Sequence, residues 1–207
     1  MALDWFTKKR EREAKRAQFA GRIPPGQELT DKWPVLHYGD IPDFDGAQWD
    51  FSVTGLVAHP MRWSYQEFMV LPRVARSNDI HCVTGWSKLD NNWEGVSLFE
   101  IARRVTPLPQ ARHVLVHAEG GYTTNLPVQE LLQDGNLLAF RHGGQDLAPE
   151  HGWPLRLVVP KLYFWKSAKW VRGLEFREAD ERGFWERYGY HNHGDPWKEE
   201  RYSWQEG

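Results

Sequence analysis

Short apolar segments separated by glycine and proline occur throughout most of this 207-residue sequence. It contains 18 glycines and 13 prolines. Both residues interrupt helices, and short apolar runs between glycine- and proline-rich turns are typical of strands rather than of a helical bundle. A chain of this length can bury one core. We therefore expect a loop-rich domain built mainly on strands.

Local patterns add short helices to this expectation. Alternating apolar residues and β-forming residues predict strands over 48–57, 113–118, 155–159 and 168–176. Ser64 and Ser97 each precede a glutamate by three residues, which is the capping-box pattern of a helix start. Pro127 is expected to begin a third helix that ends near Gly135. The prediction is an α+β fold, mostly β, with short helices dispersed among the strands.

Charge and aromatic content divide the chain into three predicted parts. Residues 1–32 form a basic N-terminal arm, whose first 22 residues carry seven lysines or arginines against three acidic residues. Residues 33–177 form the domain. Residues 178–207 carry four basic and eight acidic residues together with seven aromatic ones. Disordered tails are poor in aromatic residues, so we expect this last segment to pack on the domain; a partner-binding surface is the less favoured alternative.

Composition argues against several classes of partner. The net charge of −2 favours neither nucleic acid nor an anionic membrane. No apolar run approaches the roughly 20 residues that span a bilayer. The basic N-terminus is not followed by the apolar segment of a secretory signal. The single cysteine cannot form an intrachain disulfide and fits a reducing compartment. We expect a cytoplasmic location.

That cysteine, Cys82, lies in the stretch IHCVTGWS. Free cysteine often only fills space in a core. Here its neighbours include His81 and Thr84, which are unusually polar for an inert core thiol, and Gly85 allows close approach of the backbone. A thiolate can also act as a nucleophile or as a ligand to a soft metal. The residues alone leave all three roles open.

A second informative stretch is LLAFRHGGQDLAPEHGWPLRLVVPKLYFWKSAKWVR, residues 137–172. It contains a group of cationic and small residues: His151, Arg156, Lys166, Ser167, Ala168 and Lys169. Side-chain cations and exposed backbone N–H groups together make anion sites. Lysines that protect a strand edge are the alternative. The glycine motifs of nucleotide-binding loops do not occur in the chain, so a nucleotide-type phosphate site is not predicted.

Taken together and in this order, these stretches resemble the sulfite oxidase family of molybdopterin enzymes. IHCVTGWS and the later WEGVSL are similar to the family's cysteine loop. LLAFRHGGQDLAPEHGWPLRLVVP is similar to its Leu-Leu-Ala strand, turn and His-Gly-x-Pro-x-Arg strand. LYFWKSAKWV is similar to its pterin-phosphate segment. The resemblance covers about residues 33–177 and implies the mixed α+β fold of the family's catalytic domain.

The resemblance also implies a molybdenum–molybdopterin cofactor, with Cys82 as the protein ligand to molybdenum. It implies contacts to the pterin or its phosphate from His37, Tyr38, His151, Arg156, Lys166, Ser167, Ala168 and Lys169. The chemistry agrees with these roles, because the cofactor brings its own sulfurs and oxo groups and needs one further soft ligand. A phosphate dianion needs cations and N–H donors.

The implied activity is oxygen-atom transfer at a small sulfur- or nitrogen-containing molecule, with electrons exchanged with a separate redox partner. Sulfite-oxidising members carry an arginine five residues after the cysteine, where this chain has Ser87. A cationic sulfite pocket is therefore not indicated. Two alternatives stay open: a non-catalytic anion- or pterin-binding module on the same fold, and a cysteine-dependent hydrolase or transferase.

Overall fold

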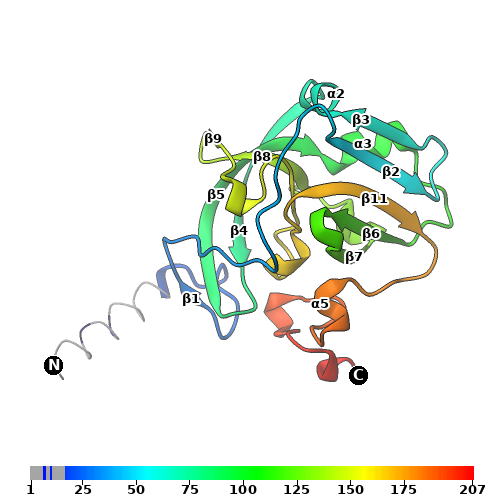
Figure 1. The fold of residues 1–207 in the computed structure, drawn as a ribbon. Coiled ribbons are helices and arrows are strands. Elements are labelled where there is room, and N and C mark those ends of the chain that lie inside the picture. The colour runs from blue at the N-terminus through cyan, green and yellow to red at the C-terminus, as the bar shows by residue number, and fades with distance from the viewer. Residues whose placement is uncertain (1–6, 8–9, 11–16) are drawn as a thin grey trace.

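Two β-sheets with short helices between their strands make up the protein in a computed structural model (Figure 1). The structure describes Thr7, Arg10 and residues 17–207. Of the predicted basic N-terminal arm, residues 1–32, the positions 1–6, 8–9 and 11–16 lie outside the described residues. No helix among the described residues has both the length and the apolar character needed to cross a membrane.

The first sheet is organised around the long strand β5. This strand pairs antiparallel with β4 and β8 and parallel with β1, while β8 continues to β10 and β9. Its strands are β1 (Glu28–Leu29), β4 (Arg73–His81), β5 (Trp86–Ser97), β8 (Leu137–His142), β9 (Gln145–Asp146) and β10 (Arg156–Val158). A β-carbon at Gly95 would lie 2.1 Å from the Leu138 carbonyl oxygen, so only glycine allows β5 and β8 to approach this closely.

The second sheet has the order β3-β2-β11-β6-β7. Its strands are β2 (Asp50–Gly55), β3 (Met61–Ser64), β6 (His113–Ala118), β7 (Thr123–Pro127) and β11 (Val171–Arg177). The β2–β11 pair is parallel, whereas the other pairs are antiparallel. β2 and β11 are neighbours in the second sheet, but between them the chain also forms strands of the first sheet. These crossings tie the two sheets into one unit.

In the part of the chain that the structure describes, short α-helices and 3₁₀ turns lie between the strands and after the last one. They are α2 (Tyr65–Met69), α3 (Leu98–Val105), α4 (Val128–Leu131), α5 (Phe184–Arg187), η1 (Glu119–Gly121), η2 (Pro149–His151), η3 (Phe164–Lys166), η4 (Pro196–Lys198) and η5 (Ser203–Gln205). Ser64 and Glu67 form the predicted capping box. Ser97 caps α3, but Glu100 pairs with Arg103 and Arg104 instead of returning to the cap.

Buried apolar side chains from both sheets form the main core. Phe51, Val116 and Phe176 contribute from the second sheet, and Leu138 and Leu157 from the first. A smaller cluster packs on the other face of the first sheet and includes Trp93, Leu137 and Val158. Leu137 and Leu138 belong to different clusters because successive strand residues face opposite sides. Both faces of β8 are therefore buried, and this strand separates the core from the region of the site.

The predicted α+β class, mostly β with short helices, is confirmed. The domain begins before residue 33, because β1 lies in the first sheet and Ile23 and Gln27 are buried. β4 and most of β5 were not predicted, since polar residues dominate both strands. At the other end, residues 178–207 return across the domain and α5 lies beside β7.

Candidate functional site

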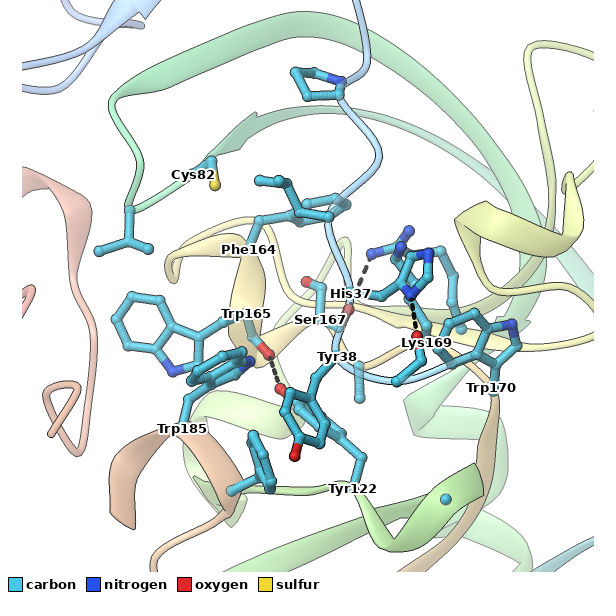
Figure 2. Close-up of a pocket in the computed structure, with 18 of the residues that line it drawn as sticks. His37, Tyr38, Cys82, Tyr122, Phe164, Trp165, Ser167, Lys169, Trp170 and Trp185 are labelled. Atoms are coloured by element: carbon cyan, nitrogen blue, oxygen red, sulfur yellow. Dashed lines mark hydrogen bonds between the residues drawn. The ribbon is translucent and has the colours of Figure 1, made fainter. Parts of the chain in front are cut away.

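A cavity of about 460 Å³ lies where several distant parts of the chain meet (Figure 2). Its walls come from residues 33–42, from the loop between β4 and β5, from residues 119–122, from Arg156 of β10, from residues 164–170 and from the C-terminal segment, defined here as residues 178–207. None of these parts is close to all the others in sequence. The cavity therefore exists only once both sheets and the C-terminal segment have assembled.

Cys82 lies at one end of the cavity, in the tight loop that joins β4 to β5. Its N–H donates to the Trp86 carbonyl, its own carbonyl accepts from the Gly85 N–H, and Gly85 has a φ of +96° that favours glycine. The thiol is buried, and Sγ lies 3.1 Å from the Thr84 hydroxyl. Burial raises the pKa of the Cys82 thiol, while Thr84 and Arg201 act in the opposite direction.

Arg156 lies at the other end, fully buried on β10. Its guanidinium donates to the carbonyls of His151 (2.7 Å) and Ser167 (2.9 Å), and its Nε has no partner. The Phe164 ring lies 4.3 Å from its central carbon. Burial lowers the pKa of Arg156 to about 9, because neutral acceptors compensate a guanidinium charge poorly.

Lys169 is a second cation at the same end. Its ammonium donates to the Glu150 carbonyl, and burial, together with the charge of Arg156, lowers the pKa of Lys169 to about 7. Within residues 17–207, neither Lys169 nor Arg156 forms an ion pair with a carboxylate. A buried guanidinium and a partly buried ammonium that face one cavity without an ion-pair partner make a site for an anion.

Ser167 and Ala168 line the wall between these cations, and both are buried. The Ser167 hydroxyl accepts a hydrogen bond from the Val159 N–H at 3.0 Å. The Ala168 carbonyl accepts from the Leu157 N–H at 2.8 Å. These bonds fix the backbone of the segment against β10, so that it forms a rigid floor for the anion end.

His37 and Tyr38 also line the cavity, from the segment without regular structure that crosses its mouth. The His37 Nδ1 is hydrogen-bonded to the Gly39 carbonyl, and its ring stands edge-on to Trp170 at 5.5 Å. The Tyr38 ring lies 4.8 Å from Phe184 of the C-terminal segment. These two residues thus join the crossing segment to two other walls of the cavity.

His151 lies behind the cavity wall rather than on it. Its ring is stacked on Trp33, with centroids 3.8 Å apart and planes 9° apart, and Trp33 lines the cavity. Burial and the neighbouring cations lower the pKa of His151 to about 4, so the ring is neutral. His151 supports the site through its carbonyl, which accepts from Arg156. A direct contact through its side chain, as the sequence suggested, would require Trp33 to move.

Lys166 does not belong to the cavity, which corrects the role inferred for its side chain from the sequence. Its ammonium is fully buried, 2.6 Å from the Glu186 carboxylate, and it also donates to Asn125 and to the Asn192 carbonyl. Glu186 belongs to the C-terminal segment. Lys166 therefore attaches this segment to the domain, and its charge is already compensated.

Ser87 has its hydroxyl 2.8 Å from the His81 ring and is completely buried. It does not line the cavity. The position at which sulfite-oxidising relatives carry arginine thus supplies no cation to this site.

Most of the aromatic residues that line the cavity were not predicted from the sequence. Long-range packing brings Trp33, Tyr122, Phe164, Trp185 and Tyr190 around the space between Cys82 and Arg156. The only signal for them in the sequence is the unusual count of 12 tryptophans. Such a wall can stack on a planar ligand and exclude water.

The family model for the oxidoreductase molybdopterin binding domain matches residues 38–185. The chain belongs to this family. It is accordingly an oxidoreductase with a molybdopterin-binding domain, which confirms the resemblance seen in the motifs.

Individual relatives agree with this assignment. The chain is 52% identical over 186 residues to the uncharacterized oxidoreductase YuiH of Bacillus subtilis, covering 89% of this chain and 94% of that protein. It is 29% identical over 169 residues to the protein-methionine-sulfoxide reductase catalytic subunit MsrP of Ralstonia nicotianae, covering 72% and 51%. The sulfane dehydrogenase SoxCD of Paracoccus pantotrophus shares the fold, with a TM-score of 0.64, 20% identity and coverage of 74% and 43%.

The cavity fits a molybdopterin group by its donors. Buried polar atoms of lining residues that have no hydrogen-bond partner include the Trp86 Nε1 and the Arg156 Nε. Buried polar groups are normally satisfied, so these atoms indicate a ligand with acceptors. A thiol at one end, an anion site at the other and aromatic walls between them match a metal, a phosphate and a pterin ring.

Proposed function

We propose that the chain binds a molybdenum–molybdopterin cofactor in this cavity and transfers an oxygen atom to or from a small sulfur- or nitrogen-containing substrate, with an organic S-oxide favoured. One observation carries the proposal. A single cavity has a buried thiol at one end and two cations without an ion-pair partner at the other. Carbonyl groups accept from part of the N–H donors of these cations, while the Arg156 Nε has no partner and the charge of both side chains is left for a phosphate.

Each end would hold a different part of the cofactor. Arg156 and Lys169 would bind the phosphate through charge-assisted hydrogen bonds, with the backbone of Ser167 and Ala168 beside them. Cys82 would bind molybdenum. When bound, the cofactor supplies two-electron exchange of an oxygen atom with the substrate.

The surroundings of Cys82 fit a metal-bound thiolate better than a free nucleophile. Burial raises the pKa of the thiol, so the charge of a metal is needed to displace its proton at neutral pH. The Thr84 hydroxyl, 3.1 Å from Sγ, can then donate to the thiolate. The buried His81 imidazole, whose pKa is lowered to about 4, is hydrogen-bonded to Ser87 rather than to Cys82.

The mouth of the cavity favours a neutral, partly apolar substrate. Leu36, Tyr38, Phe184 and Trp185 line it, and the acidic residue Asp40 lies beside them. With Ser87 turned away, the arginine and lysine side chains that line the cavity are Arg156 and Lys169, which the phosphate would occupy, whereas the Arg201 guanidinium donates to the Val83 carbonyl. A neutral S-oxide thus fits better than sulfite or nitrate, and the sulfoxide-reductase name of one relative supports this choice. Two electrons would enter or leave through a separate partner protein.

Elemental analysis tests the cofactor. Protein from a host that makes the cofactor and is supplied with molybdate is expected to contain molybdenum close to one per chain, and Cys82→Ala to contain almost none. In the loaded wild type, Cys82 should resist alkylation by iodoacetamide until the cofactor is removed, because a metal-bound thiolate is blocked. Metal-free wild-type protein from that host would contradict the proposal.

Turnover with a reduced dye tests the reaction. Loaded protein is expected to consume the dye with methyl aryl S-oxides faster than with N-oxides or nitrate, and to oxidise sulfite poorly. Bound pterin with no turnover on any of these compounds would favour the non-catalytic binding module instead.

A further inference from the structure

Four aromatic rings follow one another from the cavity wall to the protein surface. Trp165 and Tyr190 line the cavity, with ring centroids 5.0 Å apart and planes 21° apart. Tyr190 and Tyr202 are 6.0 Å and 16° apart, and Tyr202 and Trp204 are 6.2 Å and 17° apart. Trp204 is 79% exposed to solvent. Solvent is thus connected to the cavity by a series of nearly parallel rings, named here the ring series.

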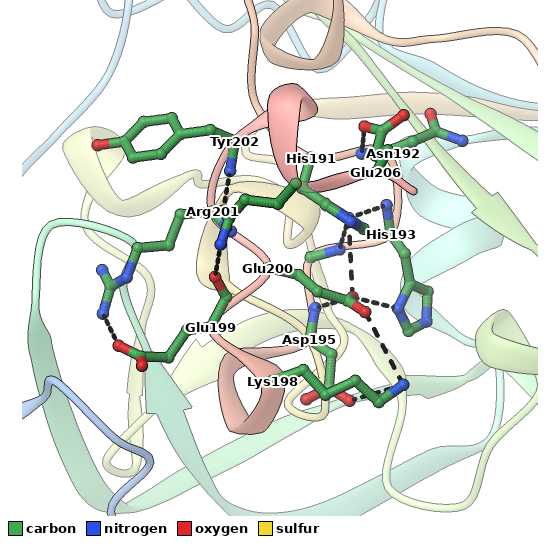
Figure 3. Close-up of polar contacts among 12 residues, drawn as sticks. His191, Asn192, His193, Asp195, Lys198, Glu199, Glu200, Arg201, Tyr202 and Glu206 are labelled. Atoms are coloured by element: carbon green, nitrogen blue, oxygen red, sulfur yellow. Dashed lines mark hydrogen bonds and ion pairs between the residues drawn. The ribbon is translucent and has the colours of Figure 1, made fainter.

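Hydrogen bonds hold the outer part of this ring series in place (Figure 3). Tyr190 and Tyr202 pair as an isolated β-bridge. The Gln205 side-chain carbonyl accepts from the Arg201 and Tyr202 N–H groups at 2.9 and 2.8 Å. The Glu206 carboxylate accepts from the Asn192 N–H at 2.7 Å. The last residues of the chain therefore present Trp204 in a defined position.

The inner part is fixed to the core of the domain and reaches the cysteine loop. Trp165 donates from Nε1 to the buried Glu186 carboxylate at 2.9 Å. Arg201, the residue before Tyr202, donates to the carbonyl of Val83, which directly follows Cys82. Trp165 and Tyr190 line the same cavity as Cys82, so the inner end of the ring series shares this space with the residue that would hold the metal.

Packing in the fold accounts for the positions of the inner rings, but it does not account for the aromatic side chains at the outer end of the ring series. Tyr202 and Trp204 are 43% and 79% exposed, and Tyr188 and Trp197 of the same C-terminal segment are also exposed. Several exposed aromatic side chains on one segment mark an interaction surface more often than a structural need. The segment is also acidic: with Glu186 set aside as the partner of Lys166, seven acidic residues face four basic ones.

We propose that the ring series conducts electrons between the cavity and a docking surface centred on Trp204, and that the partner is a basic protein that carries one electron at a time. The inference rests on the proposed function. Tunnelling of electrons weakens steeply with distance, so closely spaced conjugated rings shorten the insulating part of the path. An acidic surface attracts and orients a basic carrier.

Electron transfer along the rings involves no bond making or breaking. In the direction of S-oxide reduction, two ferrous carriers each give one electron to the site, two protons enter from solvent, and the oxygen atom of the S-oxide leaves as water. The same path can run in reverse, so that a site reduced by two electrons passes one electron to each of two ferric carriers and releases its protons to solvent.

Rapid mixing with mitochondrial cytochrome c, a basic haem protein, tests the proposal. The loaded protein is reduced with dithionite, freed of excess reductant and mixed with either ferric cytochrome c or ferricyanide, a small oxidant that needs no docking surface. Calorimetry measures the binding of ferric cytochrome c to the oxidised protein in parallel, as a readout independent of electron transfer.

Two substitutions address docking and conduction separately. Trp204→Leu should weaken cytochrome c binding about tenfold, as expected for loss of a central aromatic contact. Tyr202→Leu should slow haem reduction at saturating cytochrome c about tenfold, and Tyr202→Phe, which keeps the ring, should restore it. Both leucine variants should react with ferricyanide at the wild-type rate. Phe99→Leu, which changes an exposed ring on α3, should leave both measurements unchanged.

Three results would overturn the inference. One is reduction of ferricyanide but not of cytochrome c by the wild type. Another is an unchanged affinity in Trp204→Leu, and the third is an unchanged saturating rate in Tyr202→Leu. Failure of the proposed function would look different, because a wild type without molybdenum could not be reduced and would reduce neither oxidant.

Discussion

Lys166 and Lys169 are three residues apart in the same segment; Lys166 is fully buried and Lys169 is partly buried. Lys166 pairs with the Glu186 carboxylate at 2.6 Å, whereas Lys169 faces Arg156 and donates only to a backbone carbonyl. The carboxylate neutralises Lys166, so this lysine stabilises the fold. The charge of Lys169, which lies beside a second cation, is available to bind an anionic ligand. The difference in partners separates the residue that holds the C-terminal segment from the residue that would hold a phosphate.

Breaking the Lys166–Glu186 pair should have the largest effect on stability. Lys166→Met leaves the Glu186 carboxylate buried without its cation, which costs about 3–5 kcal/mol of unfolding free energy. Urea denaturation of cofactor-free protein measures this loss. The matched control is Arg177→Met, which removes partly exposed pairs with Glu175 and Glu181 and should cost less than about 1 kcal/mol. Equal losses in the two variants would mean that the buried pair has no special role.

Lys169→Met should have the opposite pattern. Because Lys169 has no ion-pair partner and its charge is unfavourable in the folded cofactor-free protein, its removal should not lower the unfolding free energy of that protein. It should, however, lower retention of the cofactor about tenfold or more, since a charge-assisted hydrogen bond to phosphate is worth about 1.5–3 kcal/mol. Molybdenum content after extended dialysis checks this expectation, with Lys161→Met, a change at an exposed lysine outside the cavity, as the control. Full molybdenum retention in Lys169→Met would remove Lys169 from the phosphate site.

The pH dependence of stability should show a smaller effect, which also arises because Lys169 has no anionic partner in the cofactor-free protein. The folded cofactor-free protein releases the Lys169 proton above about pH 7, whereas the unfolded chain keeps it up to the ordinary lysine range. Between these values the unfolded state binds more protons, so this contribution makes stability rise with pH. From pH 7 to 9, below the lowered pKa of Arg156, the wild type should gain stability relative to Lys169→Met. Parallel curves for the two proteins would contradict an uncompensated Lys169.

Much of the site was predictable because its chemistry depends on residue types in a fixed order. The residues alone left three roles open for Cys82 and two for the group of cations beside Arg156; the resemblance of the combined motifs to the sulfite oxidase family added the metal ligand and the phosphate site. The strands β6 and β11 were also predicted, since apolar and β-forming residues alternate there. β4 and β5 were missed because their stability comes from pairing with neighbours rather than from their own polar sequences.

The sequence by itself determined the fold class, the one thiol that could bind a metal, and the supply of cations in residues 151–169. The tertiary structure decided which cations remain available. The helical backbone of η3 ends at Lys166, and Ser167 takes φ −87° and ψ 72°, so the two lysines do not share a direction. Glu186, 20 residues after Lys166 in the chain, then neutralises one of them. Folding places the distant Glu186 carboxylate beside Lys166 and the Arg156 guanidinium beside Lys169. Charges interact through space, so the sequence alone does not show which lysine is neutralised.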